Sequence, residues 1–210
     1  MTVHVLDHPA AASRLAELRS VTTGQERFRD LVTELAMMLM YEASRDLPTE
    51  AVAVDTPLGV ADARRLLTPG PLVVPILRAG LGMLDATIRM VPTATVALLG
   101  MRRDHHSLMS SLYADTVPAR IDGRTVYLLD PMLATGGSVV LGCEHVLQRG
   151  ASKVHVLCLV AAPDGLANVG TAFPEVEIWT AAVDPKLDHN GYIHPGLGDA
   201  GDRLFGLLDS

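Results

Sequence analysis

Short apolar runs alternate with longer amphipathic stretches along most of this chain. Each run is rich in β-favouring residues and ends at a turn signal, which is typical of a buried strand. The predicted strands are Leu72–Leu77, Thr95–Gly100, Val126–Leu129, Val154–Val160 and Val176–Val183. Apolar residues at helical spacing predict helices within residues 1–20, from Phe28 to Leu39, before Met90 and over Pro163–Phe173.

This alternation predicts an α/β fold with a mainly parallel central sheet flanked by helices. Ligands of such sheets bind at the carboxyl ends of the strands. The loops that begin at Arg78, Arg102, Asp130 and Asp184 would then meet at one edge.

Two local features lie outside the predicted sheet. Thr23-Gly24-Gln25-Glu26 has the pattern of a helix capping box. Residues 51–60 alternate between apolar and polar positions and then turn, so we expect an extended arm there.

Composition limits the possible classes of protein. The 210 residues suit a single domain spanning 1–210, and 49% hydrophobic residues can fill a sizeable core. A net charge of −7 without a basic run argues against a dedicated nucleic-acid binder. No apolar run approaches the ~18 residues of a membrane span, and the N-terminus lacks a signal-peptide pattern. Cys143 and Cys158 lie in apolar runs and are expected to be buried thiols, so we expect a cytoplasmic protein.

The stretch from Val126 to Ser138 carries the clearest chemistry. A predicted strand ends at Asp130, Pro131 is expected to stop the strand ladder, and Thr135-Gly136-Gly137-Ser138 leads into a predicted helix. On that helix Val139, Val140, Cys143, Val146 and Leu147 share one face.

Adjacent glycines at a helix N-terminus let an anion approach free backbone N–H groups, and two hydroxyls add donors. The turn therefore suits a phosphate monoester, although no lysine follows the glycines as in a Walker loop. T-G-G-S alone would favour an ordinary strand-to-helix turn. The acidic residue five positions upstream, which could hold sugar hydroxyls, favours the functional interpretation.

The combination resembles the phosphoribosyl-pyrophosphate (PRPP) loop of type I phosphoribosyltransferases. Most of that family has a second acid where this chain has Pro131, and Thr where it has Ser138. D-P-M-L-A-T-G-G-S looks like the uracil phosphoribosyltransferase branch. The resemblance implies a PRPP site made of Asp130, Pro131, Met132, Leu133, Ala134, Thr135, Gly136, Gly137 and Ser138.

Two arginine motifs extend the resemblance. V-P-I-L-R-A-G-L-G-M is similar to the family's pyrophosphate loop and implies that Arg78 binds pyrophosphate, whereas an isolated R-A-G would read as a plain turn. In G-M-R-R-D-H-H, Arg103 matches the family's PRPP-binding arginine. Arg102 replaces a frequent tyrosine, and His105 and His106 replace a usually acidic pair. We interpret the two histidines as exposed loop residues and the stretch after Gly100 as a flexible flap.

The segment G-Y-I-H-P-G-L-G-D-A-G-D-R-L-F-G, residues 191–206, contains G-x-G-x-x-G. We reject a dinucleotide site, because no strand–turn–helix context surrounds the glycines. The segment resembles the family's base-binding loop. That likeness implies that Ile193, Gly198, Asp199 and Ala200 contact uracil and that Asp199 also lies near PRPP.

The resemblance implies transfer of the phosphoribosyl group of PRPP to uracil, giving UMP and pyrophosphate, with Asp130, Arg78 and Arg103 in catalytic roles. It also implies Mg²⁺ held mainly by PRPP and water, a GTP effector in some members, and a homodimer or larger homo-oligomer. Partners among nucleic acids or membranes are not expected. Two rivals stay open: an RNA-binding regulator of pyrimidine genes with the same fold, and a non-catalytic nucleotide sensor.

Overall fold

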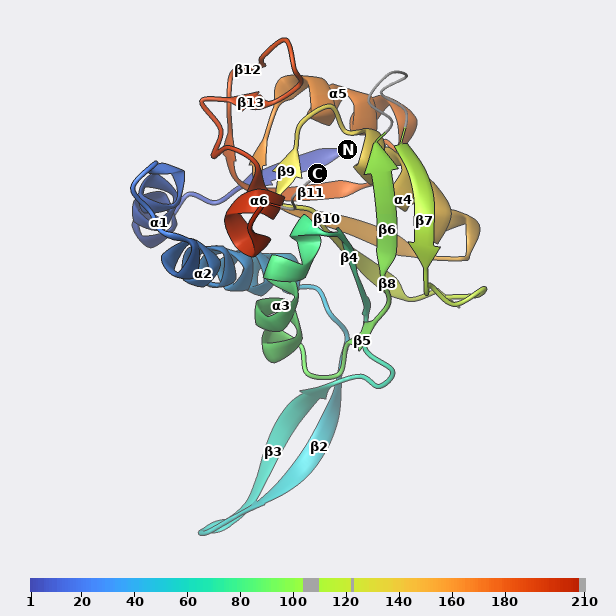
Figure 1. Cartoon of the computed structure of the whole chain (residues 1–210). Helices are drawn as coiled ribbons and strands as arrows, with labels where there is room; N and C mark the ends of the chain where they lie inside the picture. Colours follow the sequence, from blue (N-terminus) through green and yellow to red (C-terminus); the bar gives the residue numbers. More distant parts are fainter. Residues whose placement is uncertain (104–109, 122, 208–210) are drawn as a thin grey trace.

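A twisted, mainly parallel sheet forms the centre of the molecule (Figure 1). The structure is a computed structural model that describes residues 1–103, 110–121 and 123–207, without the side chains of Arg102, Arg103 and Ser110. In that part of the chain the main sheet has nine strands, with the principal order β1-β11-β10-β8-β4-β6-β7. These strands are β1 (Thr2–Val5), β11 (Glu177–Val183), β10 (Lys153–Ala161), β8 (Thr125–Leu129), β4 (Leu72–Leu77), β6 (Leu99–Arg103) and β7 (Ser110–Asp115). Two short strands pair with inner strands of the sheet, β5 (Thr95–Val96) with β4 and β9 (Met132–Leu133) with β10.

Helices cover both faces of this sheet (Figure 1). One face carries α1 (Pro9–Arg19), α2 (Gln25–Ala43), the 3₁₀ helix η1 (Ala79–Met83), α3 (Leu84–Met90) and α6 (Ala200–Phe205). The other carries α4 (Gly137–Gln148) and α5 (Pro163–Ala172). Successive strand residues alternate between the two cores, so Tyr127 and Leu129 pack under α2, whereas Val126 and Leu128 pack under α4. The prediction of an α/β fold is therefore confirmed.

The predicted arm is a long two-stranded hairpin. Strands β2 (Thr49–Thr56) and β3 (Gly59–Leu66) pair in antiparallel register and project from the body (Figure 1). Two further short strands, β12 (Lys186–Leu187) and β13 (Ile193–His194), form a separate pair near the C-terminus.

Three local predictions were wrong. The expected strand Thr95–Gly100 is broken into β5 and β6 at Ala97 and Leu98. The register of β4 places Pro75 at this break, and proline has no N–H to donate to a neighbouring strand. The capping box does not form, because the Thr23 hydroxyl donates to the Glu17 carbonyl and α2 begins after Gly24. On α4, Val139, Cys143 and Val146 are buried as predicted, but Leu147 is 37% exposed.

Pro131 also behaves differently from the prediction. Its carbonyl accepts the N–H groups of Leu159 and Val160 at 3.0 and 3.1 Å, and β9 then resumes parallel pairing with β10. Proline removes a donor but keeps its acceptor, so the ladder is interrupted and not ended. The sequence also did not predict β1, β7 or the short helix α6. The centre of the predicted flap, with His105 and His106, lies outside the described residues.

Candidate active site at the carboxyl edge of the sheet

Strands β4, β8, β10 and β11 run parallel, so the segments that follow them lie at one edge of the sheet. Gly80 brings two of these segments into direct contact. A Cβ at Gly80 would lie 2.3 Å from the carbonyl oxygen of Leu129. The turn that carries Arg78 is thus packed against the end of β8, immediately before Asp130.

Residues 134–138 form a tight turn at the start of α4. Gly136 is the N-cap residue, with φ of 82°, and a Cβ there would lie 2.9 Å from the Gly165 carbonyl oxygen. A side chain at position 136 would therefore be strained and would collide with α5. The Asn168 amide donates to the Thr135 carbonyl at 3.0 Å and holds the turn from the other side.

A small cavity of about 130 Å³ opens over this turn. It is lined by Asp130, Met132, Leu133, Ala134, Thr135, Gly136, Gly137, Ser138 and Val139. Pro131 is buried and does not line it, and the Leu133 side chain packs in the core below α4. The free N–H groups of the first turn of α4 and the hydroxyls of Thr135 and Ser138 are the donors that a phosphate group requires.

Asp130 is the carboxylate of this cavity. Burial raises its pKa to about 6, while a hydrogen bond from the Met132 N–H, at 3.4 Å, opposes the rise. Within the described residues, no three His, Cys, Asp or Glu side chains cluster closely enough to form a metal site. A single carboxylate still fits Mg²⁺, which typically takes one or two carboxylates and otherwise binds phosphate oxygens and water.

A larger cavity of about 810 Å³ adjoins the small one, and Met132, Ala134 and Thr135 line both. Its other walls come from residues 187–193 and 198–200. The structure thus brings the predicted base residues Ile193, Gly198, Asp199 and Ala200 next to the predicted phosphate turn. Ile193 and Ala200 are buried, whereas Gly198 and Asp199 are exposed.

The base-side wall includes a turn that the sequence analysis did not assign. Asp188 accepts the N–H groups of Asn190 and Tyr192 at 2.8 and 2.9 Å, and these bonds lower its pKa. The Asp188 N–H donates to the Tyr192 carbonyl and closes the turn. An Asx-turn pattern at D-H-N-G was the available signal.

Asp199 has a structural role in addition to the predicted one. Its carboxylate accepts the Asp202 N–H at 2.9 Å and caps α6. The glycines of G-x-G-x-x-G lie in and after a loop between the two-residue strand β13 and the six-residue helix α6, with positive φ at Gly196 and Gly198. Because β13 pairs antiparallel with β12, this is not the parallel βαβ unit of a dinucleotide site.

Arg203 fixes the loop to the N-terminal helices. Its guanidinium donates to the carbonyls of Leu18, Ser20 and Leu197 at 2.8 to 2.9 Å and lies 4.2 Å from the centre of the Phe28 ring. Burial lowers the pKa of Arg203. The base loop is therefore held by a segment from the opposite end of the chain.

Arg78 lies at the rim of the site and does not line either cavity. Its guanidinium is 3.4 Å from the Asp202 carboxylate, and both side chains are about a third or more exposed. This arrangement joins η1 to α6. The backbone of Arg103 lies in β6 at the same edge of the sheet, whereas its side chain, with the predicted contact to PRPP, lies outside the described part of the chain.

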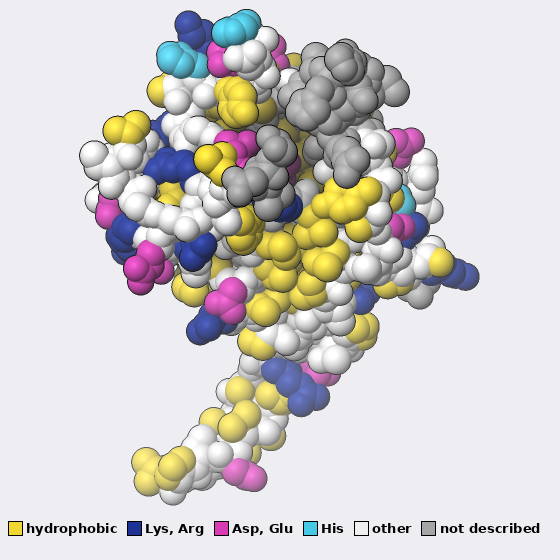
Figure 2. Space-filling model, viewed as in Figure 1, with side chains coloured by type: hydrophobic (Ala, Val, Ile, Leu, Met, Phe, Trp, Pro, Cys, Tyr) yellow, Lys and Arg dark blue, Asp and Glu magenta, His cyan; other side chains and the backbone are white. Residues whose placement is uncertain are grey.

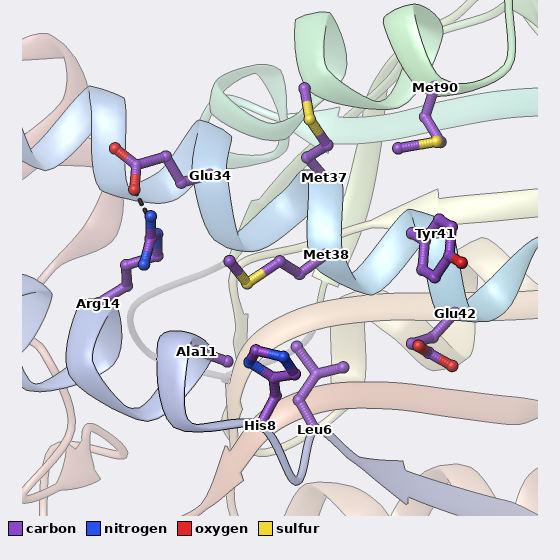
Figure 3. Close-up of a pocket in the computed structure, with 10 residues that line it drawn as sticks. All are labelled: Leu6, His8, Ala11, Arg14, Glu34, Met37, Met38, Tyr41, Glu42 and Met90. Atoms are coloured by element: carbon purple, nitrogen blue, oxygen red, sulfur yellow. Dashed lines mark ion pairs between the residues drawn. The ribbon is translucent and has the colours of Figure 1, made fainter.

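A third cavity, of about 440 Å³, lies apart from this edge between α1, α2 and α3 (Figure 3). Met37, Met38 and Met90 line its apolar part, and Arg14 pairs with Glu34 at one end (Figure 3). These unbranched, flexible side chains can adapt to the irregular space between the three helices.

Comparison with known proteins identifies the family. The family profile "Uracil phosphoribosyltransferase" matches residues 5–207. The chain belongs to the uracil phosphoribosyltransferase family. It is 52% identical to the uracil phosphoribosyltransferase of Kineococcus radiotolerans, over 99% of this chain and 100% of the relative. It is 50% identical to that of Streptomyces avermitilis, over the whole of both chains.

Solved structures share this fold. The AQ2163 protein of Aquifex aeolicus superimposes with a TM-score of 0.93 at 38% identity, covering 98% of this chain and 99% of that one. A hypoxanthine phosphoribosyltransferase of Trypanosoma cruzi reaches 0.50 at 13% identity, covering 78% of this chain and 76% of that one, a likeness of fold alone. The family profile and the curated relatives confirm the resemblance to a pentosyltransferase, and they give no support to the RNA-binding regulator. Within the described residues, every helix is too short or too polar to span a membrane.

Proposed function

We propose that this enzyme transfers the 5-phosphoribosyl group of PRPP to uracil at the junction of the two adjoining cavities, giving UMP and pyrophosphate. The observation that carries the proposal is the shared wall of Met132, Ala134 and Thr135. A turn suited to phosphate lies on one side, and a cavity large enough for a base lies on the other. That spacing suits a nucleoside monophosphate, which has a phosphate at one end and a base at the other.

Each part of the site has a role in this proposal. The turn Ala134-Thr135-Gly136-Gly137-Ser138 holds the 5′-phosphate through backbone N–H groups and hydroxyls. The Asp130 carboxylate, at the end of β8, accepts hydrogen bonds from the ribose hydroxyls. Binding energy from the phosphate then positions ribose C1, where the reaction occurs.

During transfer the C1–oxygen bond to pyrophosphate breaks, the bond from C1 to uracil N1 forms, and N1 loses its proton. Positive charge develops on the sugar and negative charge on the leaving group. The Asp130 carboxylate stabilises the first, and the guanidinium groups of Arg78 and Arg103 stabilise the second. Mg²⁺ bound with PRPP would neutralise phosphate charge, and the Asp130 carboxylate, which lines the small cavity, could be one of its ligands.

The base is read mainly by backbone groups. Uracil offers one N–H between two carbonyls, and the loop at 193 and 198–200 can offer carbonyl and N–H groups in return. Positive φ at Gly196 and Gly198 allows the bends that bring this backbone near a planar ring. Cytosine reverses the donor and acceptor character of two of these groups. We therefore expect kcat/KM for uracil to exceed that for cytosine on the order of a hundredfold or more.

The remaining family properties stay predictions for this chain. A homo-oligomer is supported by hydrophobic side chains along the projecting hairpin (Figure 2), where Leu58 is 100% and Val60 71% exposed. A single domain over 1–210 is supported by strands from both ends of the chain in one sheet. GTP activation, a mobile flap and a cytoplasmic location rest on the sequence alone.

The experiment is formation of labelled UMP from uracil, PRPP and Mg²⁺ by the purified protein, with cytosine as the competing base. We expect UMP and a strong preference for uracil. Absence of UMP would overturn the proposed function, and equal kcat/KM for the two bases would overturn the assignment of the base loop.

A further inference from the structure

A partly buried ion pair, Arg19–Asp184, contacts the base loop from behind. Asp184 follows β11, its side chain is 7% exposed, and its N–H donates to the Ala161 carbonyl at 2.8 Å. Arg19, the last residue of α1, donates from both terminal nitrogens to the two carboxylate oxygens, each at 2.7 Å. This is the bidentate geometry that makes arginine–carboxylate pairs strong and well oriented.

The same pair holds both polar backbone groups of Gly196. The Gly196 N–H donates to the Asp184 carboxylate at 2.8 Å, and the Gly196 carbonyl accepts from Arg19 at 2.7 Å. Gly196 has φ of 59°, and a Cβ there would lie 2.1 Å from the Ile193 carbonyl oxygen. The turn from Ile193 to Gly196 is therefore compact and is fixed at its closing residue.

Gly196 lies between the two groups of backbone atoms that we assign to uracil, Ile193 on one side and residues 198–200 on the other. Neither Arg19 nor Asp184 lines the base cavity. Their influence on the base can therefore pass only through the loop backbone that they hold.

We propose that Arg19 and Asp184 are positioning residues for base binding. By fixing Gly196, they set the distance and angle between the Ile193 carbonyl and the N–H groups of residues 198–200. This inference rests on the proposed function, because it assigns the loop to uracil. The inference assigns a role in base binding to α1, whose last residue, Arg19, lies 165 residues before Asp184 in the chain.

Arg14 provides a matched control on the same helix. It pairs with Glu34 on α2, and its side chain is 35% exposed (Figure 3). Arg14→Gln removes an arginine–carboxylate pair from α1 without touching the base loop. Any effect that comes merely from loosening α1 should appear in this variant as well.

The test compares wild type, Arg19→Lys, Arg19→Gln and Arg14→Gln. Arg19→Lys keeps the positive charge but loses the bidentate geometry. It provides the test if Arg19→Gln does not fold. We expect both Arg19 variants to raise KM for uracil and to lower the preference for uracil over cytosine, each on the order of tenfold. KM for PRPP should change by less than about twofold, and Arg14→Gln should resemble wild type.

An unchanged KM for uracil in a folded Arg19 variant would overturn the inference, as would an equal rise of KM for PRPP. Hydrogen exchange supplies a readout that does not need turnover. The Gly196 amide should exchange at least about tenfold faster in Arg19→Lys, while amides of β10 keep their protection. If wild type makes no UMP, the proposed function fails, and this exchange measurement still decides whether the pair holds the loop.

Discussion

The two ligand-binding regions of the site are built in different ways. The phosphate turn is continuous in sequence with β8 and α4, and its support comes from nearby α5 through Gly165 and Asn168. The base loop lies near the end of the chain, yet its backbone is held by groups that precede it by most of the chain length. Arg203 reaches the carbonyls of Leu18 and Ser20, and Arg29 donates to the Leu204 carbonyl at 2.6 Å.

The difference matters for how each region responds to change. The conformation of a strand–turn–helix unit is determined mainly by its own residues, so substitutions there should affect phosphate binding alone. A loop held by contacts with residues far away in the sequence should respond when those contacts are broken from either side. The following predictions test whether the two regions behave this differently.

Gly136→Ala should have the largest effect. Alanine at φ of 82° is strained, and its Cβ would lie 2.9 Å from the Gly165 carbonyl oxygen, so the turn must shift. A displaced turn loses aligned N–H donors, and we expect kcat/KM for PRPP to fall on the order of 10²- to 10³-fold.

Gly24→Ala is the control for the Gly136 variant, because Gly24 has φ of −67° and a Cβ there would meet no other atom within 4 Å. Its activity should match wild type. If Gly136→Ala also keeps wild-type kcat/KM, the phosphate turn has been assigned wrongly.

Asp130→Asn should reduce turnover on the order of 10²-fold while stabilising the fold. The folded-state pKa of about 6 lies above the ordinary 3.8, so the ionised carboxylate destabilises the native state at pH 7. Removing that charge should add on the order of 1–3 kcal/mol to the free energy of unfolding. Thermal unfolding and initial rates measure both effects, and a variant that is slow and also less stable would indicate a structural role instead.

The pH dependence of kcat/KM for PRPP should report the same group. Because the raised pKa of Asp130 is about 6, the carboxylate becomes protonated as the pH falls through that value. Below that pH we expect kcat/KM for PRPP to decrease, with a slope that approaches tenfold per pH unit. PRPP also titrates, so the decisive quantity is the difference from Asp130→Asn, whose profile should lack this component. Identical profiles would remove Asp130 from the catalytic step.

Asp199 variants should give the smallest effects and separate two roles of one residue. Asp199→Asn keeps an oxygen that can cap α6 and removes only the charge, whereas Asp199→Ala removes both. Loss of the cap should cost about 1 kcal/mol of stability in the alanine variant alone. Both variants should lower the rate and keep the preference for uracil over cytosine, as measured by competition kinetics. Loss of that preference would mean that the side chain reads the base.

The sequence predicted most features that depend on neighbouring residues and few that depend on residues far apart in the chain. The strand–turn–helix unit at Asp130 and its glycines could be recognised because apolar periodicity and turn residues determine such units over short distances. The contact between Arg19 and Gly196 could not be predicted, since no sequence pattern indicates which carbonyls a distant guanidinium will meet. The break between β5 and β6 lies beside Pro75 of β4, so it depends on which strands pair, which is likewise a tertiary effect.

The most direct test of this contrast is the dissociation constant of PRPP with Mg²⁺, measured by calorimetry for wild type, Gly136→Ala and Arg203→Lys. Lysine at 203 keeps a charge but cannot bond to several carbonyls in fixed directions. We predict that Gly136→Ala weakens PRPP binding on the order of 10²-fold, whereas Arg203→Lys changes it by less than about threefold and raises KM for uracil. Equal loss of PRPP affinity in both variants would show that the two loops are one cooperative unit and would contradict the account.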